Sequence, residues 1–342
     1  MVEKSYSYKK PRLMWMVLLV LFGTSIVKAQ KSKVILSVQD KRKLISEIKA
    51  SERSLSNLKV ESEAWVEEKS STSSLSDPCE PWKRTAICAI TTAWFDGRPK
   101  GKRRVDVHLE VTEWREGAAP YFEKSYSLGF DGQYGRIAEH STGYSGKTYP
   151  SRRGEILPSV PRQLKLKYLY SCTGRQFSSI FFFGEEGFTF SQLAEASITP
   201  AALEAKTFEF TLEEFQGVEC IKLGSGHQKW GHISYWLDPA RGFALLGHDN
   251  ISVREDGAER VSTRIRVTKL KEVDPNTWWP MEAYVESDRH EPGEPYKRTV
   301  YRASDVVAND PNFDETIFTV PFHDGYLVDD QVADRKYTVG QK

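Results

Sequence analysis

Alternation of apolar and polar residues with a period of two runs through most of this chain and limits its possible folds more than any other feature. The stretch RVDVHLEVTEW at 104–114 places its aliphatic residues on one side and its charged residues on the other. LKVESEAWVEE at 58–68 and YFEKSYSLGF at 121–130 alternate in the same way. Because successive side chains of a strand point to opposite faces, these segments predict strands with one buried and one solvated face, which is typical of antiparallel sheets.

Turn residues separate these strands. In YWLDPARGFALL, Asp238 can hydrogen-bond the turn backbone, Pro239 presets φ for a type I turn, and Gly242 accepts a left-handed conformation. This pattern predicts a hairpin of antiparallel strands at 230–238 and 243–253. Asp-Gly pairs give further hairpin signals at 96–97, 131–132 and 256–257. Additional strands are predicted at 260–273, 277–288 and 295–303.

Helical periodicity is confined to a few segments. DKRKLISEIKASERSLSN at 40–57 has apolar residues at helical spacing and predicts an amphipathic helix with Asp40 as its N-cap. A second, short helix is predicted at 188–196, whereas 162–172 fits either a helix or a strand. Long exposed loops, rich in Ser, Gly, Pro or Arg, are predicted at 69–81 and 142–160.

The N-terminus carries the pattern of an export signal. Basic residues precede the apolar run 13–22, and the sequence VKA ends at Ala29, just before Gln30. This pattern predicts a secretory signal peptide over 1–29 that is cleaved between Ala29 and Gln30. The alternative is a retained membrane anchor, although the run is shorter than the ~20 apolar residues of a spanning helix. The expected location is the periplasm or cell envelope, with membrane association if the N-terminal segment is not cleaved.

Composition sets the class of protein. With 48 basic and 47 acidic residues, the chain shows no nucleic-acid footprint, which usually requires a pI above ~9. After a linker at 30–39, we expect a single domain over 40–330 and a C-terminal tail over 331–342. A chain of this length buries enough surface to be stable without a disulfide or metal. The cysteines are nonetheless candidates for disulfides in an oxidising compartment, or for buried free thiols: Cys79, Cys88, Cys172 and Cys220.

Motifs for catalysis, cofactors and metals are absent from the sequence. It contains no P-loop, HExxH, nucleophile elbow or glycine-rich dinucleotide turn. A metal site in GSGHQKWGH would use His227, His232 and Cys220, but this spacing matches no recognised ligand set. A hairpin loop with solvated imidazoles is the simpler interpretation. We therefore expect no enzyme, no catalytic residues, no metal and no cofactor.

An aromatic cluster is the clearest candidate binding feature. SSIFFFGEEGFTF at 178–190 concentrates phenylalanines, which either line a lipid-sized cavity or form a central strand that is buried on both faces. The candidate cavity-lining residues are Phe181, Phe182, Phe183, Phe188, Phe190 and Trp236.

The order of several segments resembles the LolA/LolB-like lipoprotein-carrier superfamily, including the N-terminal domain of RseB-type periplasmic sensors. The segments are the helix and strand from Leu44 to Val66, GFDGQYGRI at 129–137, FEFTLEEFQGVECIKL at 208–223, YWLDPARGFALL at 235–246, WWPMEAYV at 278–285 and DPNFDETIFTVPFHDGYLVDD at 310–330. The resemblance implies a mostly β fold, a strongly curved antiparallel sheet or incomplete β-barrel, with a few helices on its concave face. The chain departs from the family in its greater length and its two long loops, and no matched residue assigns lipoprotein transfer.

Three functions follow from these features. The first is a non-enzymatic exported protein that holds a lipid or lipoprotein acyl chain in a half-barrel, as a carrier or envelope sensor. The second is a structural or interaction module that binds an envelope protein and fills its sheet with its own rings. The third is a secreted hydrolase that uses carboxylates or the histidines of the 224–232 loop.

Overall fold

The computed structural model describes residues 34–69, 81–96, 101–111, 122–142, 151–159, 189–201, 208–227, 231–253, 257, 259–286 and 296–341. The chain divides into two units, residues 1–33 and 34–342, and all described residues belong to the second. Within that part, no helix combines the length and hydropathy needed to cross a bilayer.

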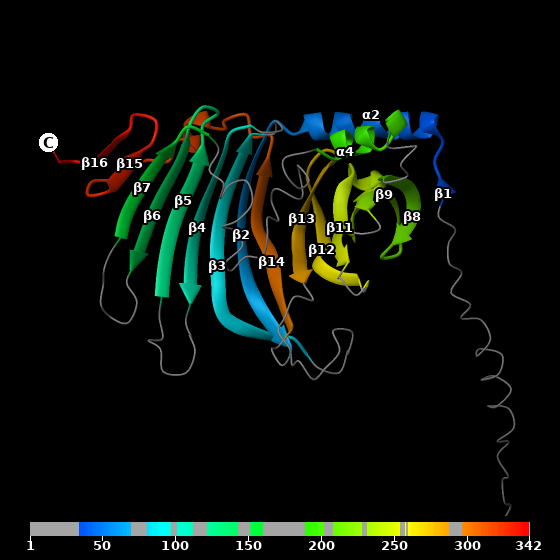
Figure 1. Ribbon diagram of the computed structural model, residues 1–342, viewed down its shortest axis with the longest axis horizontal. Coiled ribbons are helices and arrows are strands. Elements are labelled where there is room, and N and C mark those ends of the chain that lie inside the picture. The colour runs from blue at the N-terminus through cyan, green and yellow to red at the C-terminus, as the bar shows by residue number, and fades with distance from the viewer. Residues whose placement is uncertain are drawn as a thin grey trace, which may run out of the picture. The chain divides into compact units, whose positions relative to one another are not determined.

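The strands of the described residues form one sheet built from two meanders (Figure 1). The first meander contains β2 (Asn57–Lys69), β3 (Lys83–Asp96), β4 (Arg103–Val111), β5 (Phe122–Phe130), β6 (Gly135–Thr142) and β7 (Ser151–Leu157). The second contains β8 (Phe208–Phe215), β9 (Val218–His227), β10 (Gly231–Asp238), β11 (Ala244–Val253), β12 (Glu259–Asp274), β13 (Thr277–Glu286) and β14 (Tyr296–Ala308). They join where β14 pairs antiparallel with β2.

Short strands form the two edges of this sheet. At one edge, β1 (Val34–Ile35) pairs with β8. At the other, β15 (Leu327–Asp330) pairs with β7 in the sheet's one parallel ladder among the described strands, and β16 (Arg335–Thr338) follows β15. Since β1 and β16 do not pair, the sheet stays open, and it is strongly curved (Figure 1). The predicted mostly β, incomplete barrel is therefore confirmed.

The hairpin between β10 and β11 forms as its residues dictate. The Asp238 carboxylate accepts a hydrogen bond from the Ala240 amide at 2.9 Å, and Pro239 begins a 3₁₀ turn in place of a simple type I turn. Gly242 has φ +59°, and a Cβ there would lie 2.2 Å from the Asn276 carbonyl oxygen. The position therefore requires glycine both for its backbone conformation and for the close approach of a neighbouring turn.

Two α-helices are described, α2 (Val38–Ser54) and α4 (Phe190–Ala196). The predicted N-cap at Asp40 was wrong, because the helix begins earlier. Ser37 is the N-cap, and its hydroxyl accepts a hydrogen bond from the Asp40 amide at 3.1 Å. Helix α4 begins with a capping box in which Thr189 and Gln192 satisfy each other's backbone amides.

Strand β7 corrects the predicted loop over 142–160, since residues 151–157 pair with β6. The strand was missed because the apolar side chains that cover it come from the distant C-terminal segment. A Cβ at Gly154 would lie 2.8 Å from the ring of Phe322 and 3.1 Å from the side chain of Val328. The segment 331–342, expected to be a tail, contains β16.

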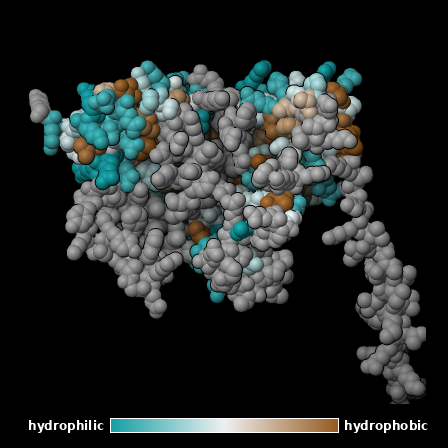
Figure 2. All heavy atoms as spheres, viewed as in Figure 1, coloured by the Kyte–Doolittle hydropathy of each residue, from teal (hydrophilic) through white to brown (hydrophobic). Residues whose placement is uncertain are grey.

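The two faces of the sheet carry different cores. We call the face contacted by α2 and α4 the inner face, and the opposite one the outer face. The inner-face cluster contains residues from both helices and from β2–β6 and β8–β14. The outer face has two small clusters, one of Ala138, Val320, Tyr326 and Val328 and one of Cys220, Trp236 and Leu246. On the surface seen in Figure 2, hydrophobic residues form separate small groups among hydrophilic ones.

Candidate functional site

The inner face is a continuous apolar surface that spans both meanders. Leu58 of β2, Ile221 of β9 and Ile265 of β12 are each 0% exposed and belong to one cluster. Alternation explains this clustering, because every second residue of each strand points to this face. These side chains form the main hydrophobic core of the described residues.

Helix α2 crosses the turn end of the second meander. Near its start, the Lys41 ammonium lies 5.7 Å from the centre of the Phe210 ring on β8. Near its end, the Ser51 hydroxyl donates to the Gly242 carbonyl at 2.7 Å, and the Ser56 amide beyond it donates to Asn309 at 2.7 Å. Figure 1 shows α2 and α4 together along this end of β8–β13. The described helices therefore cover one end of the inner face.

A carboxylate joins the two helices. Glu52 of α2 accepts hydrogen bonds from the Ser191 amide at 3.0 Å and from the Ser191 hydroxyl at 2.5 Å. Burial raises the pKa of Glu52, while the hydrogen bonds from Ser191 and Thr189 act in the opposite direction. An ion pair between Lys49 and Glu195 also holds the helices together, nearer the surface. These contacts fix α4 on α2 and so fix the position of the cover.

Polar groups on the inner face lie within the apolar cluster. The Trp279 indole N–H donates to the Tyr301 hydroxyl at 3.2 Å, and burial raises the pKa of Tyr301. The phenol is therefore neutral at physiological pH. His248 is 0% exposed and stacks on the Tyr235 ring with centroids 4.7 Å apart. This part of the face thus offers hydrogen-bonding groups without a charge on the phenol.

Of the predicted cavity-lining residues, only Phe190 and Trp236 lie among the described residues. Phe181, Phe182, Phe183 and Phe188 lie outside the described residues. Phe190 is the first residue of α4 and packs edge-to-face on Tyr235, with centroids 5.5 Å apart, on the inner face. It therefore belongs to the helical cover and contacts the sheet surface through Tyr235.

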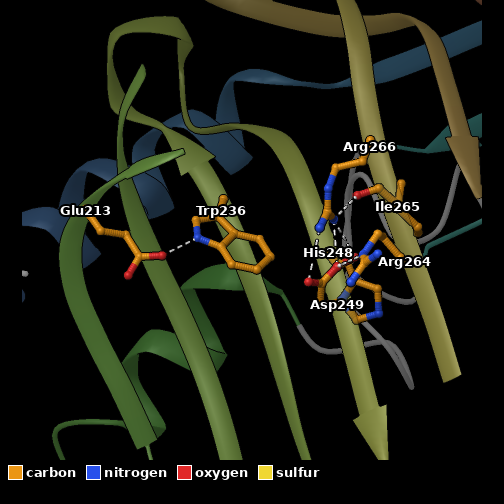
Figure 3. A network of polar contacts seen from close by, with 7 residues as sticks. All are labelled: Glu213, Trp236, His248, Asp249, Arg264, Ile265 and Arg266. Carbon is orange, nitrogen blue, oxygen red and sulfur yellow. Dashed lines mark hydrogen bonds and ion pairs between the residues drawn. The ribbon is translucent and has the colours of Figure 1, made fainter. Parts of the chain in front are cut away.

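Trp236 lies on the outer face, so the structure does not bring it together with Phe190. Tyr235 points inward, and its neighbour in the strand must point outward. The Trp236 ring stacks on Phe215 with centroids 4.4 Å apart, and its N–H donates to Glu213 (Figure 3).

Beside Trp236, an ion-pair network on β11 and β12 continues the outer face (Figure 3). Asp249 binds Arg266 through two hydrogen bonds of 2.6 and 3.1 Å and lies 3.5 Å from Arg264. The Arg266 guanidinium also lies 5.1 Å from the centre of the Phe215 ring. Every charge in this group has a partner in the protein, so the network stabilises the strand pairing.

The other residues singled out in the sequence are dispersed. Cys79 and Cys172 lie outside the described residues, and Cys88 lies on β3. Cys220 is a buried free thiol, and burial raises its pKa to about 12. His227 and His232 lie on neighbouring strands of the β9–β10 hairpin. Over the described ranges, no three His, Cys, Asp or Glu side chains gather to hold a metal ion.

Comparison with known proteins gives distant structural likenesses. No family model matches the sequence, and no curated protein matches it. Among solved structures, the chain is similar to a DUF1329 family protein from Desulfovibrio piger, with 10% identity and a TM-score of 0.43 over 82% of this chain and 97% of that one. It is also similar to a putative outer membrane lipoprotein-sorting protein domain from Vibrio parahaemolyticus, with 12% identity and a TM-score of 0.42 over 83% of this chain and 97% of that one.

A third similar structure is LprF from Mycobacterium bovis, with 9% identity and a TM-score of 0.25 over 81% of this chain and 97% of that one. The Vibrio protein is named for lipoprotein sorting. At these TM-scores and identities, none of the three likenesses assigns a function to this chain.

Proposed function

We propose that this chain is an exported, non-enzymatic protein that binds a lipid or lipoprotein acyl chain against the inner face, as a carrier or envelope sensor. The observation that carries the proposal is the continuous apolar inner face of an unclosed sheet, which the described helices cover at one end. Export rests on the N-terminal pattern of residues 1–29, which supports a location in the periplasm or cell envelope. If that segment is retained, it anchors the protein in the membrane.

The energetics of such a site are favourable. Each acyl methylene that leaves water contributes ~0.8 kcal/mol. Ten buried methylenes then contribute about 8 kcal/mol, which corresponds to a dissociation constant of about 1 μM before the entropic cost of binding. Under this proposal, an acyl tail needs no charged contact to its headgroup in order to bind.

A binding titration with a matched pair of variants tests the proposal. Residues 30–342, freed of lipid, are titrated with a fatty acid that carries an environment-sensitive fluorophore. Ala64 is 3% exposed on the inner face of β2, and Ala50 is exposed on α2. If an acyl chain occupies the inner face, the Ala64→Leu variant stays folded and its affinity for the probe falls by about fivefold or more. The Ala50→Leu variant then binds the probe as tightly as the wild-type protein does. Failure of the wild-type protein to bind the probe saturably would overturn the proposal.

The second candidate is an interaction module whose sheet is filled by its own side chains. The complete burial of Leu58, Ile221 and Ile265 favours it. In a filled core, the larger side chain of Ala64→Leu has no space and destabilises the fold by about 1–3 kcal/mol. The same variant therefore separates the two functions, because a carrier tolerates it and loses ligand, whereas a filled module loses stability and has no ligand to lose.

A further inference from the structure

A cleft of about 320 Å³ lies on the outer face of the first meander, away from the inner face. Its floor consists of two rows of cross-strand neighbours on β3, β4 and β5. The first row consists of Thr92, Asp106 and Ser127, and the second row, beside it, of Ile90, His108 and Ser125. The C-terminal segment forms a wall with Pro321, His323 and Tyr326. We call this site the outer cleft.

The charges in the outer cleft cancel within the protein. Arg104 and Asp106 form a two-bonded ion pair, with both N···O distances 2.9 Å. Arg104 also donates to the Ile317 carbonyl at 3.0 Å, so its guanidinium is directed at protein partners. The other polar side chains of the lining carry hydroxyl or imidazole groups. A ligand with a net charge would meet no unbalanced opposite charge among these residues, which favours an uncharged ligand.

The hydrogen-bonding groups are spread over the floor and the wall. His108 Nδ1 lies 3.1 Å from the Ser125 hydroxyl oxygen, and Thr92 and Ser127 add hydroxyls in the neighbouring row. A hydroxyl both donates and accepts, so such a floor suits ligand groups that do the same. Ligand hydroxyls have this property, whereas carbonyl or ammonium groups do not.

Apolar surface is interleaved with these polar groups. Ile90 is 57% exposed and presents its aliphatic side chain at the floor. Pro321 and Tyr326 line the same cleft from the wall. The site therefore offers apolar contact for C–H groups beside hydrogen bonds for hydroxyls, and a neutral cyclic sugar presents both on one small molecule.

We propose that the outer cleft binds a neutral saccharide, of about one or two sugar rings, through the hydroxyl and imidazole groups of its floor and the Ile90, Pro321 and Tyr326 surfaces. The site lies on the opposite face of the sheet from the inner-face cluster. A saccharide in the outer cleft and an acyl chain on the inner face would therefore occupy separate space.

Saturation-transfer NMR on residues 30–342 tests this proposal, since residues 34–342 form a compact unit. The probes are glucose, N-acetylglucosamine and cellobiose, with glucuronate and glucosamine as charged analogues. We expect at least one neutral probe to give a saturable signal and to bind at least fivefold more tightly than either charged analogue. No signal from any neutral probe, or equal binding of a charged analogue, would overturn the proposal.

A pair of tryptophan variants locates the binding. Ser127→Trp fills the outer cleft, whereas Ser304→Trp places the same ring at an exposed position of β14. We expect Ser127→Trp to lose the saccharide signal at least tenfold and Ser304→Trp to retain it, with both variants keeping the wild-type affinity for the acyl probe. Equal saccharide binding by the two variants would contradict the site. If Ser127→Trp does not fold, His323→Ala replaces it, with an expected loss of at least threefold, and unchanged binding counts against the proposal.

Discussion

Replacing Ile48 with alanine tests whether α2 belongs to the inner-face core. Ile48 is 1% exposed in the cluster that joins the helix to the sheet. The substitution removes three carbons, whose transfer from water is worth about 2.4 kcal/mol at ~0.8 kcal/mol each. A residual void of roughly 50 Å³ adds about 1 kcal/mol at ~24 cal/mol per Å³. The higher helix propensity of alanine returns about 0.4 kcal/mol, so we expect a net loss of about 3 kcal/mol.

Urea unfolding measures this loss. Ile48→Ala should lower the midpoint without changing the m-value, because the surface exposed on unfolding stays nearly the same. Ser46→Ala is the matched control, since Ser46 is exposed on the same helix, and it should change stability by less than about 0.5 kcal/mol. If Ile48→Ala cost less than about 1 kcal/mol, α2 would not be packed on the sheet as described, and the reasoning would fail.

Three further predictions follow from single contacts. Gly129→Ala should lower the free energy of unfolding by about 1–3 kcal/mol, because a Cβ there would lie 2.6 Å from Phe318 O and from Val320 Cγ2. A loss of less than about 0.3 kcal/mol in the same urea assay would be inconsistent with that packing. Cys220 should resist alkylation at pH 8 in the folded protein, since burial raises its pKa to about 12, and peptide mass spectrometry showing labelling at the rate of an exposed thiol would contradict this. Because burial raises the pKa of Glu52, the folded state binds its proton more tightly than the unfolded state. The linked stability is therefore greatest at low pH and is lost as pH rises through the folded pKa. Glu52→Gln should flatten this part of the pH–stability curve, and an unchanged slope would refute the assignment.

Local sequence signals located most strands because each carries its own alternation and its own turn. The strands predicted at 230–238 and 243–253 agree closely with β10 and β11, since Asp238 and Gly242 fix the turn between them. The predicted short helix at 188–196 likewise agrees with α4, which has its own capping box.

Features that depend on distant pairing could not be found in this way. β7 has no apolar alternation of its own, and the Phe322 side chain that covers it comes from the C-terminal segment. The β14–β2 pairing joins the two meanders and has no local signal. Alternation alone puts Trp236 on the opposite side from Tyr235, but only the packing of Phe190 on Tyr235 shows which side the helices cover.

The outer cleft shows the same limit. Its floor comes from three strands whose register aligns Thr92, Asp106 and Ser127 in one row, and its wall comes from a segment near the C-terminus. None of these residues stands out in the sequence, because isolated hydroxyls and single histidines are common on the solvated faces of strands. The site becomes visible only when the C-terminal segment is placed on the outer face.

Native mass spectrometry of the protein, extracted gently from its own cell envelope, tests the central claim most directly. If the inner face holds an acyl chain, the spectrum shows the polypeptide with an added mass. Organic extraction then releases this added mass, which is identified as lipid. A spectrum that contains only the bare polypeptide mass, before and after extraction, would contradict the account.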